Sequence, residues 1–219
     1  MKTQKDYWNK KIVDWTKVSY DKKEKNVPLA EKIATHFRAI SKRMDVTLKL
    51  LGPLVNNKTV LNLGCGLGNE CFALLGFNPK KVIGIDISSV AIEEAQERAK
   101  KRKLDKKTEF IEVDISQLKT LPEFDYVIGL GFIDYLTNDE LQGLFEKIGN
   151  RPYFFSYFEK KFSLLNLMHA LYVRWQKCPG AYKYSRAEIE SIVPSSSQNY
   201  ILEEDSLLFL TNIDDLRKN

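Results

Sequence analysis

Short apolar runs alternate with longer segments of helical periodicity along the middle of this chain. The segments 60–63, 81–88 and 110–115 each contain an apolar run of strand length. Between residues 88 and 103, apolar side chains recur instead at helical spacing. Strands that alternate with helices predict parallel βαβ units, and therefore an α/β fold with helices on both faces of a doubly wound sheet.

The N-terminal part of the chain has a different pattern. Residues 3–20 carry aromatic and apolar side chains at helical spacing, and residues 29–51 carry a second apolar stripe. Gly52 and Pro53 end this second segment, because neither residue continues a helix well. We therefore expect a helical cap over residues 1–55.

The C-terminal part continues the alternation and then changes. Strand patterns lie at residues 124–135 and 153–158, and Thr137 provides the cap of a helix between them. The runs at 200–202 and 207–210 surround an acidic turn and predict a closing hairpin. A hairpin at this position would add antiparallel strands at the edge of the sheet.

Size and composition indicate one globular domain. A chain of 219 residues with 43% hydrophobic and 29% charged residues can bury a substantial core, so we expect one domain over 1–219 with its α/β core at 56–219. No apolar run approaches the length of a membrane span, and the first residues lack an apolar signal segment. Three cysteines form no metal or disulfide pattern, which favours the cytoplasm.

The net charge of +5 does not arise from a single dominant basic tract. Residues 100–103 are all basic, but they follow the helical pattern that begins at Ser88. Positive charge at the C-terminal end of a helix complements the helix dipole, so we expect a solvated helix end here and no nucleic-acid patch. The basic balance of the whole chain still favours an acidic substrate.

A glycine-rich turn follows the first strand pattern. Gly64, Gly66 and Gly68 remove side chains where the backbone must bend and approach a ligand. A dinucleotide-binding turn needs its third small residue one position later, where this chain has Asn69. The spacing is G-x-G-x-G, which favours a different nucleoside cofactor; a tight turn without a ligand is the alternative for this motif taken alone.

Acidic residues end the second and third strand patterns. Asp86 follows Gly64 by 22 residues, which suits hydrogen bonds to both hydroxyl groups of a ribose. Asp114 follows the third run, and its alternative role is to cap a short turn that begins at Ser116.

The turn and the two acids, in this order, resemble motifs of the class I S-adenosylmethionine (SAM) methyltransferases over about residues 58–150. The resemblance implies a seven-stranded, mostly parallel sheet with an N-terminal helical extension and an antiparallel C-terminal edge hairpin. It also implies that Asp114 accepts a hydrogen bond from the adenine amino group. The residues expected to bind SAM are Asn62, Gly64, Cys65, Gly66, Gly68, Asp86, Ile87, Asp114, Ile115, Gly129 and Leu130.

Two positions of this resemblance concern the methionine end of the cofactor. Many members carry an acid two residues before the first glycine, where it holds the ammonium group, and this chain has Asn62. An amide oxygen accepts a hydrogen bond but carries no full charge, so we expect a lower cofactor affinity. The glycines at 129 and 131 resemble the fourth motif, where backbone carbonyls approach the cofactor and the methyl acceptor.

The acceptor side is less defined. A base is needed only for an acceptor that holds its proton tightly, and the chain has two histidines, His36 and His169. His169 lies in a helical pattern at 162–175 that is locally similar to magnesium-protoporphyrin methyltransferases and related small-molecule O-methyltransferases, so it is the candidate catalytic base, with a structural role as the alternative. The N-terminal aromatic residues belong to the core or form a lid that includes Tyr20 as a substrate contact.

Other chemistries fit less well. Methylation of a nucleobase amino group usually involves an Asp/Asn-Pro-Pro-aromatic run after the fourth strand, and this chain has no proline there. Asp134 and Asp139 are expected to have surface or capping roles, and no metal site is predicted. We therefore expect a SAM-dependent methyltransferase that acts on an oxygen of a small molecule, without a nucleic-acid partner. A protein or RNA methyltransferase and a non-enzymatic SAM-binding module are the alternatives.

Overall fold

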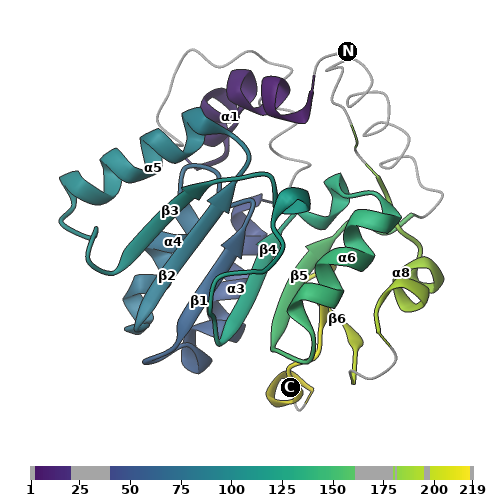
Figure 1. Ribbon diagram of the computed structural model, residues 1–219. Coiled ribbons are helices and arrows are strands. Elements are labelled where there is room, and N and C mark those ends of the chain that lie inside the picture. Colours follow the sequence, from purple (N-terminus) through teal and green to yellow (C-terminus); the bar gives the residue numbers. More distant parts are fainter. Residues whose placement is uncertain (1–2, 21–39, 161–179, 181, 195–197, 218–219) are drawn as a thin grey trace.

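The computed structural model describes residues 3–20, 40–160, 180, 182–194 and 198–217, except for the side chains of residues 13–20 and 40 (Figure 1). The described strands form one seven-stranded sheet in the order β3-β2-β1-β4-β5-β7-β6. Their bounds in chain order are β1 (Thr59–Leu63), β2 (Lys81–Asp86), β3 (Thr108–Glu112), β4 (Tyr126–Leu130), β5 (Tyr153–Tyr157), β6 (Tyr200–Glu204) and β7 (Leu207–Thr211).

The predicted sheet topology is confirmed. Strands β1 to β5 pair parallel with one another, and β7 pairs antiparallel with both β5 and β6. The strand order reverses between β1 and β4, because β2 and β3 lie on one side of β1 and the later strands lie on the other. Ligands of open α/β sheets bind at such a reversal, beyond the carboxyl ends of the strands.

Helices cover both faces of the sheet (Figure 1). One core joins α3 (Ile40–Leu51), α4 (Asn69–Leu74) and α5 (Ser89–Lys101) to one face. The second core joins α6 (Asn138–Ile148) and α8 (Arg186–Ile192) to the opposite face. The alternation of side chains along each strand explains this division, since Val60 packs in the first core while Leu61 packs in the second.

Local capping chemistry fixes where the helices begin. The Thr137 side chain accepts from the Glu140 backbone N–H, and Glu140 in turn accepts from the Thr137 N–H. Ser185 and Glu188 form the same reciprocal arrangement at α8. The expected cap at Thr137 is therefore confirmed, and the helix behind it starts at the next residue.

Two predicted segments differ in extent from the structure. The fourth strand is shorter than residues 124–135 because Gly131 adopts a left-handed φ of 66° and a 3₁₀ turn over Ile133–Tyr135 follows. The predicted helix at 29–51 is confirmed as α3 from Ile40 onward, while its earlier residues and the segment 162–175 lie outside the described residues.

The closing hairpin is confirmed, and its turn residues explain its geometry. Asp205 and Ser206 connect β6 to β7 with φ values of 54° and 63°. Positive φ at both central residues is typical of the hairpin turn whose twist matches that of the flanking strands. Strand β7 thereby lies beside β5, and β6 becomes the edge of the sheet.

The stacked pair of Phe154 and Phe209 predicts a large stability loss on truncation. Both side chains are fully buried and their ring centroids are 4.6 Å apart. Phe209→Ala should lower the free energy of unfolding by about 3–5 kcal/mol, because it leaves a cavity beside Phe154 in the core that joins α3, α4 and α5 to the sheet. Phe77→Ala, at a ring that is 36% exposed, is the control and should cost less than half as much in chemical denaturation.

Candidate functional site

The glycine turn between β1 and α4 has the backbone that only glycine adopts readily. Gly64, Gly66 and Gly68 have φ values of 70°, 52° and 76°. A Cβ atom built on Gly64 would lie 2.8 Å from Phe132, and one built on Gly68 would lie 2.8 Å from Phe110. A side chain at either position would therefore collide with a neighbouring ring as well as strain the turn.

Asp86, the last residue of β2, anchors this turn. Its Oδ2 accepts from the Gly66 backbone N–H at 2.8 Å, and its Oδ1 accepts from the Ser88 N–H at 2.9 Å. The backbone N–H of Gly64 also bonds to the Ile85 carbonyl at 2.8 Å. The carboxylate has about four acceptor positions, so these two bonds leave capacity for ribose hydroxyl groups.

The environment of Asp86 favours the neutral acid more than water does. Burial raises its pKa, while backbone N–H groups of Ser88, Gly66 and Ile87 lower it, and the net pKa is raised from 3.8. Cys65 in the adjacent turn is also buried, and desolvation together with the neighbouring Cys71 thiol raises its pKa well above the usual value. This cysteine therefore behaves as an apolar filler.

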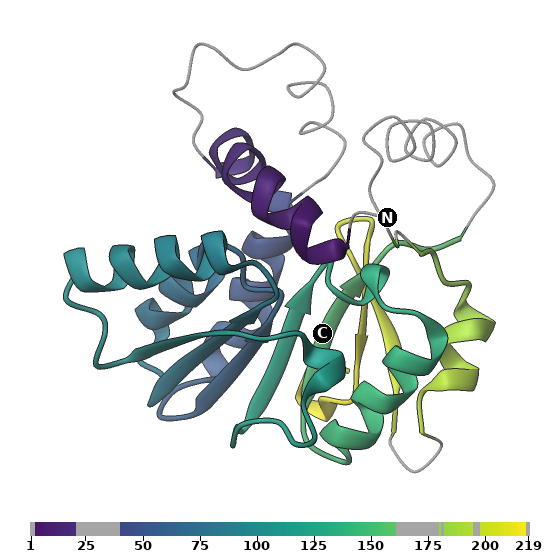
Figure 2. The same ribbon diagram turned by 45° about the horizontal axis from the view of Figure 1, so that its top comes forward.

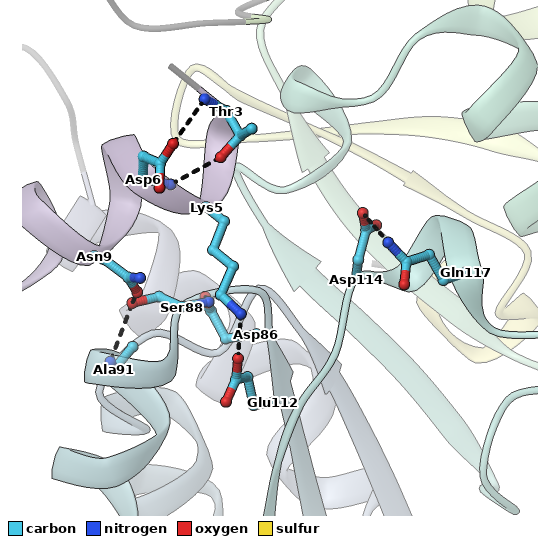
Figure 3. Close-up of polar contacts among 10 residues, drawn as sticks. All are labelled: Thr3, Lys5, Asp6, Asn9, Asp86, Ser88, Ala91, Glu112, Asp114 and Gln117. Carbon is cyan, nitrogen blue, oxygen red and sulfur yellow. Dashed lines mark hydrogen bonds and ion pairs between the residues drawn. The ribbon is translucent and has the colours of Figure 1, made fainter. Parts of the chain in front are cut away.

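Asp114 has the capping geometry that was the alternative for this position. Its Oδ1 accepts from the Ser116 N–H at 3.0 Å and from the Ser116 hydroxyl at 2.7 Å. Its Oδ2 accepts from Gln117 Nε2 at 3.3 Å (Figure 3). Ile115 beside it is buried. The capping role does not compete with a bond to adenine, because a carboxylate accepts more than three hydrogen bonds.

Asn62 lies in β1 directly before the turn and is fully buried. Its Nδ2 donates to Glu70 Oε2 at 3.1 Å and approaches Cys71 Sγ at 3.5 Å. Among the described residues, its Oδ1 has no hydrogen-bond partner. A buried carbonyl-type acceptor without a partner is costly, so this atom is suited to a donor group on a bound ligand.

The end of β4 brings the backbone close to the same region. The Gly131 N–H donates to Ser156 Oγ at 2.8 Å, and a Cβ on Gly131 would lie 2.8 Å from Arg43 Nη1. A Cβ on Gly129 would lie 3.0 Å from the Phe155 ring. Leu130 between them is half-buried, and the glycines on either side let Phe155 and Arg43 pack closely against this strand end.

Asp134 is buried at this end of the sheet, and the expected surface or capping role is wrong. The side chain is 5% exposed and accepts from the Phe158 backbone N–H at 2.9 Å. Burial raises its pKa to about 6, against the lowering effects of Arg43, the Phe158 N–H and Lys183. Arg43 is itself buried, with its guanidinium 4.4 Å from the centre of the Phe158 ring.

Helix α1 (Gln4–Tyr20) crosses the carboxyl edge of the sheet (Figure 2). Gln4 Nε2 donates to the Tyr135 carbonyl at 2.9 Å, and the Trp8 ring meets the Tyr135 ring edge to face at 5.0 Å. A Cβ built on Gly66 would lie 3.4 Å from Ile12 Cδ1. The helix therefore reaches from the end of β4 to the centre of the glycine turn.

Polar contacts hold α1 against the start of α5 and the end of β3 as well. Asn9 Oδ1 accepts from the Ser88 hydroxyl at 2.8 Å, and Lys5 pairs with Glu112 at 2.5 Å (Figure 3). Glu112 ends β3 directly beside Asp86 at the end of β2. Helix α1 thus lies over the predicted cofactor site, whereas its aromatic residues were expected to belong to the core or to form a lid over the acceptor.

The predicted acceptor residues fall outside what the structure describes. His169 and His36 lie outside the described residues, and Tyr20 is described for its backbone alone, at the end of α1. Within the described residues, no group of three or more His, Cys, Asp or Glu side chains is arranged to hold a metal ion. No helix in the same part of the chain is long and apolar enough to cross a membrane.

Sequence reasoning missed Arg43, Glu70 and the covered face of α1. Arg43 lies in an apolar helical stripe and Glu70 lies in the first turn of α4, where a charged residue is ordinarily solvated. Their burial depends on contacts with distant segments, which periodicity does not report. One available signal was the amide at position 62, where the motif usually has an acid.

The central part of the chain is similar in sequence to known methyltransferases. Residues 54–148 match the family model described as a methyltransferase domain. Curated relatives are the tRNA U34 carboxymethyltransferases of Shewanella amazonensis, 36% identical over 85 residues, and of Haemophilus influenzae, 30% identical over 91 residues. These matches cover 38% and 42% of this chain but 25% and 28% of the relatives. The similarity therefore spans about a quarter of their length.

Solved structures resemble nearly the whole chain. Magnesium protoporphyrin IX methyltransferase from Synechocystis PCC 6803, with bound S-adenosylhomocysteine (SAH), has a TM-score of 0.66 and 19% identity, covering 95% of this chain and 98% of that one. Phosphoethanolamine N-methyltransferase 2 from Haemonchus contortus, in complex with SAM, has a TM-score of 0.64 and 17% identity, covering 93% and 46%. At these identities the likeness shows the fold, and the family match agrees with the motifs read from the sequence. Residues 54–148 therefore match the methyltransferase-domain family, within a fold that is also seen in structures of methyltransferases with bound SAM or SAH.

Proposed function

We propose that this enzyme transfers a methyl group from SAM to an oxygen atom of a small molecule. The position of α1 is the observation that carries the proposal. Gln4, Asn9 and Ile12 bring this helix onto the end of β4, the start of α5 and the glycine turn. An acceptor that reacts beneath such a cover must fit between the helix and the sheet, which favours a small molecule.

The residues at the carboxyl edge fit SAM. The glycine turn provides bare backbone, Asp86 retains acceptor capacity for the ribose, and Asn62 Oδ1 suits the ammonium group. SAM supplies an activated methyl group on its sulfonium, so the protein contributes position and exclusion of water. We assign the other cofactor contacts to the residues predicted from the motifs, with Asp114 facing the adenine.

The end of β4 suits an oxygen acceptor. Asp134 is a buried carboxylic acid with a pKa of about 6, close to the range in which a general base works near neutral pH. Arg43 and Lys183 place positive charge beside it, which would orient an acceptor carboxylate if that is the reacting group. The resemblance of nearly the whole chain to a magnesium protoporphyrin IX methyltransferase is a second, independent support for a small-molecule acceptor. His169 stays a candidate base from the sequence.

A tRNA acceptor is the second candidate, because curated relatives are tRNA U34 carboxymethyltransferases. The location of the basic run at residues 100–103 argues against it. Residues 100–103 are at and beyond the end of α5, which runs back from the carboxyl edge toward the start of β3. This basic cluster therefore lies at the edge of the sheet opposite the predicted active site.

A cytoplasmic location remains a prediction from composition.

A transfer assay separates these candidates. Purified protein with radiolabelled SAM would be offered panels of small carboxylic acids, phenols and alcohols, and in parallel unmodified total tRNA. Label in a base-labile ester or a stable ether of a small molecule supports the proposal. Label that enters tRNA alone would overturn the small-molecule assignment, and label on nitrogen would overturn the oxygen assignment.

Asp86 should be needed for cofactor binding. Asp86→Ala removes an acceptor that serves both the ribose and the Gly66 N–H, so SAH affinity measured by calorimetry should fall by about 10- to 150-fold. Glu109→Ala, an exposed acid near the other end of the sheet, is the control and should leave affinity unchanged. Normal affinity in a folded Asp86→Ala protein would show that the ribose site is elsewhere.

The covered face of α1 should affect cofactor affinity. Ile12→Gln places a polar side chain opposite Gly66, and we expect SAH to bind several-fold more weakly because the cover packs less well. Lys10→Gln introduces the same side chain on an exposed position of the same helix. Equal affinities of these two variants in calorimetry would show that α1 does not close over the cofactor.

Asp134 should make stability depend on pH. Because its pKa rises on folding from 3.8 to about 6, the folded state holds the proton more tightly and loses stability as the pH rises through this interval, by up to about 3 kcal/mol. Asp134→Asn has no such proton. Its free energy of unfolding relative to wild type should therefore increase between about pH 4 and pH 7 in urea titrations. Asp139→Asn, at an exposed acid, is the matched control, and a difference that does not vary with pH would contradict the assignment.

A further inference from the structure

Asn62 and Glu70 form a buried pair beneath the glycine turn. Asn62 lies two positions before Gly64, and Glu70 lies two positions after Gly68 in the first turn of α4. Their exposed fractions are 0% and 8%, and Asn62 Nδ2 donates to Glu70 Oε2 at 3.1 Å. A carboxylate is thus held in contact with the residue that replaces the usual acid of the motif.

This contact determines the orientation of the Asn62 amide. The nitrogen must face the carboxylate, because the opposite orientation would place two oxygen acceptors against each other. The amide oxygen is then the group left for another partner, and it has none among the described residues. Glu70 therefore selects which atom of Asn62 is offered to a ligand.

The charge of Glu70 also reaches the turn. The carboxylates of Glu70 and Asp86 both raise the pKa of the Cys65 thiol, which lies between Gly64 and Gly66. A negative charge so close to a water-poor turn favours a cationic ligand group, since Coulomb interactions are stronger in a low-dielectric site. The α-ammonium group of SAM is both cationic and a hydrogen-bond donor, so it matches the free oxygen and the nearby charge together.

We propose that Glu70 is a positioning residue that orients Asn62 toward the cofactor's ammonium group and supplies the negative charge that position 62 lacks. The negative charge that the motif usually has on β1 is then provided by Glu70 on α4, while Asn62 Oδ1 is the atom that contacts the ammonium group. The proposal rests on SAM as the cofactor, and it adds a residue outside the predicted set.

Two ligands separate this role from a purely structural one. SAH carries the ammonium group, whereas 5′-methylthioadenosine has the same nucleoside without the amino-acid end. Glu70→Gln keeps an acceptor for Asn62 Nδ2 and removes the charge, so SAH affinity by calorimetry should fall about tenfold. Affinity for 5′-methylthioadenosine should stay unchanged, because this ligand does not reach the pair.

An exchange of the two side-chain types provides the matched control. The double variant Asn62→Asp/Glu70→Gln returns the charge to β1 and keeps a hydrogen bond between the two positions. It should restore SAH affinity to within about threefold of wild type. The double variant contains one carboxylate and one amide, as the natural protein does, so it should fold even if Glu70→Gln alone does not. The proposal therefore stays testable in that case.

Three results would decide against the proposal. Equal losses of affinity for both ligands in Glu70→Gln would show that Glu70 acts only on the structure of the turn. Unchanged SAH affinity in Glu70→Gln would show that the charge of Glu70 is not used in binding. If the double variant did not recover SAH affinity, a carboxylate at position 62 would not replace the charge of Glu70. If wild type bound 5′-methylthioadenosine but not SAH, the ammonium site itself would be absent, whereas binding of neither ligand would refute the cofactor assignment.

Discussion

The site depends on the carboxylate of Asp86, which joins three parts of the chain that are distant in sequence. Its two oxygens accept from the backbone of the glycine turn at Gly66 and from Ser88 at the start of α5. The Ser88 hydroxyl then accepts from Ala91 and donates to Asn9 of α1. The turn, the helix start and the cover are therefore connected through one buried acid, and a change at Asp86 should be felt in all three.

Burial of this acid is unfavourable unless hydrogen bonds compensate for it. Backbone N–H groups do so in part, yet the pKa of Asp86 stays above 3.8 and that of Asp134 rises to about 6. Both acids therefore lie in surroundings from which water is largely excluded. Such surroundings strengthen the attraction of carboxylates for a cationic cofactor, because less solvent screens the charges. In the proposed reaction, the same exclusion of water would protect the methyl donor from competing nucleophiles.

Much of this arrangement follows from local sequence signals. The glycine spacing, the acids at the strand ends and the Thr137 cap each depend on residues a few positions apart, so the parallel order and the turn were predictable. Asp134 was expected to have a surface or capping role, because nothing near it in sequence indicates that the Phe158 N–H and Arg43 converge on it. For the aromatic residues of α1 a core role and a lid both stayed open, since helical spacing does not specify what the apolar face of this helix contacts.

The distribution of charge shows why the composition of the chain was a weak guide to its substrate. The net charge of +5 includes the basic residues 100–103, which lie at the amino edge of the sheet where α5 ends. The carboxyl edge instead collects acids from successive strands, among them Asp86, Glu112 and Asp134. A Debye length of about 8 Å at physiological salt screens the distant basic cluster from this edge. Among the described residues, Lys5, Arg43 and Lys183 place positive charge beside these acids, so the local charge at this edge differs from the overall charge of the chain.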